Sequence, residues 1–275
     1  ENLWFRYAGS ERWALRGVSL EVERGEFVLI LGGTGAGKST LLRAMNGLIP
    51  HFYPGEMRGR VLVDGVDTRE ARVSELARKV GLVFQNPENQ IVTLRVEREV
   101  AFGLENIGMS REEMRRRVYS TLKALGIENL AGRSTLSLSG GEKQLVAIAS
   151  VLALGPDAIV LDEPTAELDP RNSMLVASVL AELNRSGKTV VIAEHRVDLF
   201  APLASKIVVL KEGALGLSGD PREVFSRELL EEMGVSLPRT VEIWRELRVR
   251  GIRVEGPPLG EEECVDLLRE LTCSG

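Results

Sequence analysis

The run Gly32-Gly33-Thr34-Gly35-Ala36-Gly37-Lys38-Ser39 constrains the fold of this chain more than any other feature. It fits the phosphate-binding loop pattern GxxxxGK[ST] at every fixed position. The apolar run Phe27–Leu31 before it indicates a buried strand, and the residues from Thr40 onward continue as a helix. Such a glycine-rich turn lets backbone N–H groups point at phosphate oxygens, and the helix start adds the positive end of its dipole. We expect Lys38 to reach the β- and γ-phosphates and the Ser39 hydroxyl to bind Mg²⁺.

The composition argues against several classes of protein. The chain has 275 residues, a net charge of −5 and only two cysteines. This charge gives no electrostatic reason to expect nucleic acid as a partner, and two cysteines are too few for a disulfide framework. No apolar run reaches the roughly 18 residues of a transmembrane helix, so we expect no segment that spans a membrane by itself.

Short apolar runs alternate with helical patterns along most of the chain, an order typical of a parallel sheet covered by helices. The segment before the phosphate-binding loop predicts an antiparallel β-rich start. Helical periodicity dominates between about residues 95 and 153 and indicates a helical insertion. After Gly219 the chain is charged and predicts short helices separated by glycine and proline. Strands are predicted at 3–7, 14–22, 27–31, 60–65, 80–84, 158–161, 189–193 and 207–210.

Two carboxylates follow the apolar run 158–161 and narrow the range of reactions that this chain could catalyse. Asp162, at the carboxyl end of this predicted strand, is expected to hold Mg²⁺, directly or through water, beside the phosphate-binding loop. Glu163 is then placed to polarise a water that attacks the γ-phosphate. Together with Lys38 and Ser39 these residues predict a nucleoside triphosphatase.

A second glycine-containing motif comprises Leu138, Ser139, Gly140, Gly141 and Glu142. Two glycines after a serine at a helix start present bare N–H groups and a helix dipole, which together make an anion site. One nucleotide already has its phosphates held at Lys38. The second anion site therefore makes most sense if it completes the ATP pocket of another subunit.

With these motifs in place, the chain resembles the ATP-binding-cassette (ABC) ATPases over residues 1–218. The run Gly32 to Ser39, continued by Thr40, is similar to the Walker A loop, Asp162 and Glu163 to the Walker B aspartate and catalytic glutamate, and Leu138 to Glu142 to the signature. The resemblance also assigns a glutamine that contacts Mg²⁺ and water, a switch histidine at the γ-phosphate, a D-loop aspartate between the two sites and an aromatic that stacks on adenine. These residues are Gln85, His195, Asp169 and Tyr7, with Phe5 and Trp13 as neighbouring aromatic alternatives to Tyr7.

The resemblance implies an α/β fold with a P-loop NTPase core, an antiparallel β subdomain and an α-helical subdomain over about residues 86–153. Residues 1–218 would form this nucleotide-binding domain, and residues 219–275 a small helical C-terminal accessory domain. The sequence departs from the family pattern at Glu142, where glutamine is commoner, and at Glu167 of the D-loop, where a small residue is usual. We expect both departures to tune activity and not to abolish it.

The segment Gln85–Gln90, continuing to Val100–Gly103, is similar to the region after the Q-loop in ATPases of energy-coupling factor importers, which take up vitamins or transition metals. This resemblance implies a second ATPase subunit, identical or paralogous, an integral membrane coupling subunit and a substrate-binding membrane subunit. It also implies a peripheral position at the cytoplasmic face of the membrane, with ATP and Mg²⁺ as ligands. An exporter ATPase, a soluble ABC ATPase of another process and a non-catalytic ATP-dependent dimerisation module stay open as alternatives. The sequence does not name the cargo.

Overall fold

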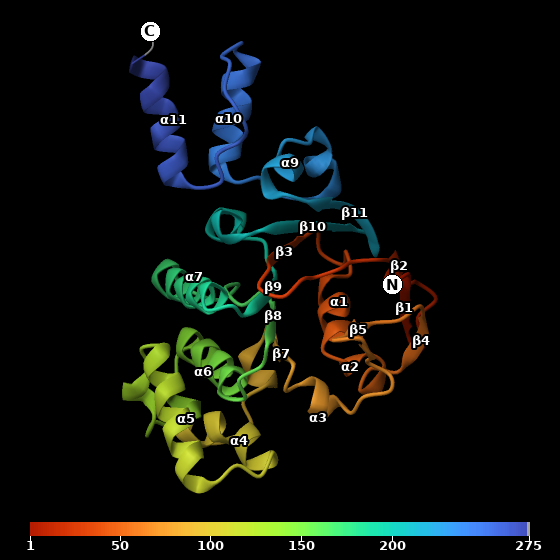
Figure 1. Ribbon diagram of the computed structural model, residues 1–275, viewed down its shortest axis with the longest axis vertical. Coiled ribbons are helices and arrows are strands. Elements are labelled where there is room, and N and C mark those ends of the chain that lie inside the picture. The colour runs from red at the N-terminus through yellow and green to blue at the C-terminus, as the bar shows by residue number, and fades with distance from the viewer. Residues whose placement is uncertain (274–275) are drawn as a thin grey trace.

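A mixed six-stranded sheet forms the centre of the molecule in the computed structural model, which describes residues 1–273 (Figure 1). The strand order is β11–β10–β3–β9–β8–β7. All neighbouring pairs run parallel except β10 and β11, which form an antiparallel edge. The strands are β3 (Phe27–Leu31), β7 (Val80–Val83), β8 (Ala158–Asp162), β9 (Thr189–Ala193), β10 (Lys206–Lys211) and β11 (Ala214–Gly219).

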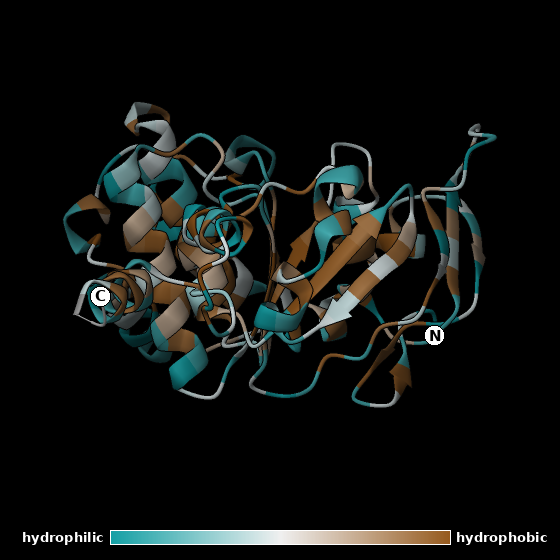
Figure 2. Cartoon of the chain, turned by 90° about the horizontal axis from the view of Figure 1, so that it is seen from above, coloured by the Kyte–Doolittle hydropathy of each residue, from teal (hydrophilic) through white to brown (hydrophobic). Residues whose placement is uncertain are grey.

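Alternate residues of the central strands enter two different apolar cores, because successive side chains of a strand point to opposite faces. In β3, Leu29 and Leu31 belong to one core, and Val28 and Ile30 belong to the other. All five residues of β3 are buried. Figure 2 shows the consequence as a band of hydrophobic residues along the central strands. A strand that is buried on both faces reads as a continuous apolar run, which is why the sequence predicts β3 to the residue.

One face of the sheet carries helix α1 (Lys38–Met45) and a separate antiparallel sheet, shown at the right of Figure 1. This second sheet has the order β2–β1–β4, with β1 (Leu3–Tyr7), β2 (Leu15–Val18) and β4 (Gly55–Arg58). Leu3 and Phe5 point from β1 into the same apolar core as Leu41 and Leu42 of α1. Smaller elements here are α2 (Leu48–His51), β5 (Leu62–Val63), β6 (Val66–Asp67) and α3 (Val73–Leu76).

The other face carries the expected helical insertion and the C-terminal helices. Its long helices are α4 (Val96–Asn106), α5 (Arg111–Ala124), α6 (Gly140–Ala153) and α7 (Pro170–Arg185). The short helix α8 (Val197–Phe200) lies between β9 and β10, and α9 (Pro221–Phe225), α10 (Arg239–Val249) and α11 (Glu261–Cys273) follow β11. Single 3₁₀ turns lie at Pro87–Asn89, Glu128–Leu130, Thr135–Ser137, Ala201–Leu203 and Glu228–Met233. None of the helices within residues 1–273 is both long and apolar enough to cross a bilayer.

The segment after Gly219 packs directly on the sheet core. Phe225 and Leu230 are fully buried and Trp244 is 3% exposed, and all three belong to the apolar cluster that includes Leu29 of β3. The indole Nε1 of Trp244 donates a hydrogen bond of 2.6 Å to the carbonyl of Glu255, which ties α10 to the chain before α11. The C-terminal helices therefore share an apolar core with the nucleotide-binding motifs.

Candidate active site

The phosphate-binding loop connects β3 to α1 and depends on glycines for its shape. Gly32, Gly35 and Gly37 have φ values of 147°, 76° and 103°, in a region that residues with a side chain rarely adopt. A Cβ at Gly32 would lie 2.3 Å from the carbonyl oxygen of Leu210 in β10. These glycines let the loop pass close to the sheet and leave its N–H groups facing the space before α1. Strand, loop and helix therefore have the arrangement that binds phosphate.

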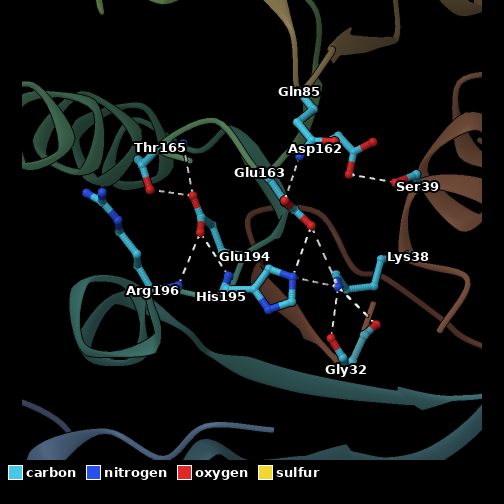
Figure 3. Close-up of polar contacts among 11 residues, drawn as sticks. Gly32, Lys38, Ser39, Gln85, Asp162, Glu163, Thr165, Glu194, His195 and Arg196 are labelled. Atoms are coloured by element: carbon cyan, nitrogen blue, oxygen red, sulfur yellow. Dashed lines mark hydrogen bonds and ion pairs between the residues drawn. The ribbon is translucent and has the colours of Figure 1, made fainter. Parts of the chain in front are cut away.

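Lys38, the first residue of α1, is 5% exposed and holds the loop from inside. Its Nζ donates to the carbonyl of Gly32 at 2.8 Å and lies 3.1 Å from Nε2 of His195 (Figure 3). The same ammonium group is 3.7 Å from Oε1 of Glu163. Burial lowers the pKa of Lys38, and the nearby carboxylates oppose this shift. A triphosphate that displaced the carbonyl contacts would give this buried cation a stronger partner.

Ser39 and Asp162 lie side by side at the entrance of the loop. The Ser39 hydroxyl donates a hydrogen bond of 3.0 Å to Oδ1 of Asp162. Asp162 is 4% exposed, and burial raises the pKa of its carboxyl group, while the bond from Ser39 opposes the shift. Hydroxyl and carboxylate oxygens are the hard donors that suit Mg²⁺, which commonly takes one or two protein ligands together with phosphate oxygens and water. The pair fits a Mg²⁺ site of this kind.

The carboxylate of Glu163 contacts the other two predicted catalytic residues, His195 and Gln85. Its Oε1 is 3.1 Å from Nε2 of His195, and its Oε2 accepts a hydrogen bond of 2.8 Å from the amide of Gln85 (Figure 3). The backbone of Glu163 has a φ of 46°, a left-handed conformation that is uncommon for glutamate. A hydrogen bond of 2.8 Å from its N–H to the carbonyl of Ala193 in β9 stabilises this conformation. The carboxylate is thereby directed toward the phosphate-binding loop.

One residue that organises this site is not among the predicted site residues: the buried Glu194. Its two oxygens accept hydrogen bonds from both the N–H and the hydroxyl of Thr165, at 2.9 and 2.5 Å, and from the N–H of His195 at 2.8 Å. Glu194 therefore joins the loop after Glu163 to the loop that carries His195 (Figure 3). An acidic residue directly after the fully buried strand β9, whose last four residues are apolar, was the available signal, because a buried carboxylate needs several hydrogen-bond donors.

Tyr7 lies at the end of β1 with its phenol group directed at the phosphate-binding helix. Its hydroxyl is 3.1 Å from the hydroxyl of Thr40 and accepts a hydrogen bond of 3.2 Å from Arg43. Of the two alternative aromatics, Phe5 is fully buried in the core. Trp13 is flanked by the guanidinium groups of two arginines, with the nearer one 4.9 Å from the ring centre. Of these three aromatics, Tyr7 is the one whose side chain forms hydrogen bonds with residues of α1.

The signature residues lie at the start of α6, away from the phosphate-binding loop in the same chain (Figure 1). Ser139 is the N-cap of α6, and its hydroxyl accepts from the N–H of Glu142 at 3.3 Å. Within residues 1–273 no hydrogen bond or ion pair joins the signature to the loop of residues 32–39. The D-loop residue Asp169 caps α7 and accepts a hydrogen bond from the side-chain amide of Asn172, which packs against Gly141. D-loop and signature are thus neighbours.

A phosphate-binding loop on a parallel sheet, with an acidic pair at the end of the adjacent β8 and a histidine after β9, defines the class of P-loop nucleoside triphosphatases. A model of the ABC transporter family matches residues 15–166. EcfA1 of Symbiobacterium thermophilum, an energy-coupling factor transporter ATP-binding protein, is 46% identical over 96% of this chain and 91% of its own length. An ABC transporter ATP-binding protein of Pyrococcus horikoshii is 46% identical over 98% of this chain and 95% of its own length.

Solved structures agree with these sequence comparisons. CbiO1 of Clostridium perfringens, described as part of the ABC transporter complex CbiONQ, matches with a TM-score of 0.73 and 37% identity, over 89% of this chain and 97% of that chain. An ATP-binding cassette solved as a dimer with ADP and phosphate matches with a TM-score of 0.69 and 33% identity, over 80% of this chain and 99% of that chain. The chain belongs to the ABC transporter family, as an ATP-binding ATPase subunit of the energy-coupling factor type. The expected fold class, family and ATPase activity are confirmed at this level.

Proposed function

We propose that this chain hydrolyses ATP to power an importer of vitamins or transition metals, as a head-to-tail dimer with a second copy of itself or a paralogue. The observation that carries the proposal is the set of contacts around Glu163. Its carboxylate meets His195 at 3.1 Å and Gln85 at 2.8 Å, and it lies 3.7 Å from the ammonium group of Lys38. The proposed base Glu163, the proposed γ-phosphate sensor His195 and the phosphate-binding cation Lys38 thus lie within contact distance of one another.

The phosphates of ATP would lie along the N–H groups of residues 32–39, with Tyr7 against the adenine. Lys38 would turn from the carbonyl of Gly32 to the β- and γ-phosphates, since a phosphate is a stronger acceptor than a carbonyl. Ser39 and Asp162, with Gln85 nearby, would hold Mg²⁺, which neutralises charge on the β- and γ-phosphates when it is bound.

Hydrolysis needs an acceptor for the proton of the attacking water. Glu163 would take that proton, and it would have to part from His195 and Gln85 to do so. His195 would then turn its Nε2 to the γ-phosphate, a short movement because this atom already lies 3.1 Å from Nζ of Lys38. Catalysis of this kind consists of positioning and electrostatic stabilisation.

The second half of each site would come from the partner subunit. Ser139, Gly140 and Gly141 at the start of α6 would bind the γ-phosphate held by the partner's loop, and Asp169 would lie between the two sites. The separation of signature and phosphate-binding loop within one chain supports this arrangement, as does the dimeric cassette among the related structures. The apolar groups of Leu138 and Leu168 are buried beneath these polar residues and fix their position.

The membrane coupling subunit would dock beside Gln85. The 3₁₀ turn Pro87–Asn89 begins two residues after Gln85, and the side chains of Val92 and Leu94 just after it are 65% and 67% exposed. Two apolar side chains exposed together on a polar loop suit contact with another protein. A substrate-binding membrane subunit would complete the transporter, and this chain would lie at the cytoplasmic face of the membrane.

The test is light scattering of the Glu163→Gln protein with and without ATP and Mg²⁺. We expect ATP to convert a monomer into a dimer, because the variant retains nucleotide and cannot release the closed state by hydrolysis. The wild-type protein should release phosphate steadily under the same conditions. A variant that hydrolyses ATP at the wild-type rate would contradict the role of Glu163, and failure to bind ATP would overturn the whole proposal.

A further inference from the structure

Arg133 and the signature residue Glu142 form an ion pair next to the signature serine. One guanidinium nitrogen of Arg133 donates to Oε1 of Glu142 at 2.7 Å, and the other donates to the carbonyl of Ser137 at 2.9 Å. The second carboxylate oxygen of Glu142 accepts from the N–H of Ser139 at 2.8 Å. A single arginine thus holds both the carboxylate in the first turn of α6 and the loop that leads into it.

Under the proposed head-to-tail dimer, the carboxylate of Glu142 would add a negative charge near the triphosphate held by the partner subunit. It lies in the same helical turn as Ser139 and Gly141, which under the proposed function receive a γ-phosphate. Hydrogen bonds from the Ser139 backbone, aided by Arg133, lower the pKa of Glu142, so the group is ionised at neutral pH.

Other charged groups near this turn have their own partners. Lys143, the next residue of α6, forms an ion pair with Glu88 in the 3₁₀ turn after the Q-loop. The carboxylate of Asp169 accepts hydrogen bonds from the backbone and side chain of Asn172. Within residues 1–273, Arg133 is the cation that forms an ion pair with Glu142.

We propose that Arg133 is a positioning residue for the ATP site of the partner subunit, where it neutralises Glu142 and fixes the loop before Ser139. This inference rests on the proposed head-to-tail dimer. An arginine suits the task because its planar fork reaches a carboxylate and a carbonyl at once, which a lysine ammonium group does not reproduce. The pair is partly exposed, with 42% and 29% of the two side chains accessible, so it contributes little to folding.

The negative charge of Glu142 affects ATP binding more strongly once the dimer closes. Closure removes water from the space between Glu142 and the partner's triphosphate, and the repulsion of an unpaired carboxylate grows as the effective dielectric constant falls. Loss of Arg133 should therefore weaken ATP-driven dimerisation while leaving ATP binding to the monomer unchanged. In a protein that lacks Arg133, removal of the charge on Glu142 should restore ATP-driven dimerisation.

The experiment compares four proteins that all carry Glu163→Gln: the parent, Arg133→Gln, Glu142→Gln and the double variant. Light scattering during a titration with ATP and Mg²⁺ gives the ATP concentration at which half of each protein is dimeric. We expect Arg133→Gln to raise this concentration by at least about tenfold. Glu142→Gln should lower it, since Arg133 is then an unpaired cation near the partner's triphosphate, and glutamine also serves as the third residue of a capping box. The double variant should return to within about threefold of the parent.

Two controls separate this inference from the proposed function. Equal melting temperatures of the parent and Arg133→Gln would show that the fold is intact, and equal ATP affinities at dilute protein would show that the monomer site is intact. A double variant as weak as Arg133→Gln would overturn the charge role, and an Arg133→Gln protein that dimerises at the same ATP concentration as the parent would overturn the inference altogether. A parent that binds ATP without pairing would instead refute the self-paired dimer on which the inference rests.

Discussion

The side-chain amide of Gln85 donates a hydrogen bond of 2.8 Å to the carboxylate of Glu163, across the neighbouring strands β7 and β8. Gln85 is also the second residue after β7 on the path to the helical insertion. The carboxylate proposed as the base is thereby connected to the part of the chain that would contact a membrane subunit. Movement of that part would change the hydrogen bonding of the base itself.

Replacement of Glu163 by glutamine should lower the turnover number for ATP by about 10²–10⁴-fold with little change in KM, since proton transfer is lost and binding is kept. Steady-state phosphate release measures both constants. Glu212→Gln is a matched control, because Glu212 also has a left-handed backbone, with φ of 49°, but lies on an exposed turn. Equal losses in the two variants would mean that the effect comes from the backbone conformation.

Asp162→Asn should stabilise the nucleotide-free protein at neutral pH, because burial raises the pKa of Asp162 and so disfavours its ionised form in the folded state. At a pH above the pKa that Asp162 has in the folded protein, its ionised carboxylate destabilises the folded state relative to asparagine. This penalty decreases as the pH falls toward about 4, the pKa of aspartate in the unfolded chain. We expect the melting temperature to rise by about 2–4 °C at pH 7 and the gain to shrink in acid. A variant that melts lower than the wild type at pH 7 would contradict this.

Gly141→Ala should destabilise the fold, while Gly140→Ala should not. A Cβ at Gly141 would lie 2.7 Å from Nδ2 of Asn172, whose amide already bonds to Asp169, whereas a Cβ at Gly140 meets no atom within 4 Å. The loss of one such hydrogen bond corresponds to about 1 kcal/mol. Thermal unfolding of both variants without nucleotide measures the difference. Equal melting temperatures of the two variants would show that Asn172 moves away from the added methyl group without a loss of stability.

Tyr7→Ala should raise the KM for ATP by about tenfold, since an aromatic contact contributes roughly 0.5–1.5 kcal/mol beyond the burial of its area. Tyr7→Phe keeps the ring and should stay within about threefold of the wild type, although the contacts with Thr40 and Arg43 are lost. Trp13→Ala serves as the control because that ring is already flanked by arginines. A larger effect from Trp13→Ala than from Tyr7→Ala would reassign the adenine contact.

Trp244→Ala should destabilise the whole protein by about 3–5 kcal/mol in one cooperative transition, because Trp244 shares an apolar core with β3. Calorimetry of the full chain measures this. A separate, early transition in the variant, with the main transition unchanged, would show instead that the residues after 219 form an independently folding domain. Glu246→Ala, an exposed change in the same helix, should have almost no effect.

The sequence predicts those strands that are buried on both faces and misses those that are held mainly by their backbone. Thr189–Ala193 is buried along its whole length and apolar after Thr189, and the sequence predicts it to the residue. Gly55–Arg58 carries polar side chains and becomes a strand only because its backbone pairs with β1. Ala214–Gly219 contains two glycines and a serine, and it pairs with β10 at the sheet edge. Whether such a segment forms a strand depends on its pairing with a strand that is distant in the sequence. No local sequence pattern encodes this pairing.

The same distinction applies to the site. Residues within a short motif, such as Lys38 and Ser39, can be assigned because the spacing itself defines their place on the loop. Glu194 and Arg133 gain their meaning from partners on other segments, Thr165 in one case and Glu142 in the other. Their hydrogen bonds depend on tertiary packing, and only the structure brings these groups together.

The two-sided burial of β3 also bears on how freely this chain can vary. A strand with one solvent-facing side accepts polar substitutions there, but Phe27–Leu31 has no such side. Each change would disturb the packing against α1 or against the opposite helices, so only swaps that conserve volume are tolerated well. In a library of random variants, the segment before the phosphate-binding loop should retain its apolar character as strictly as the loop retains its glycines, although none of its side chains would touch ATP.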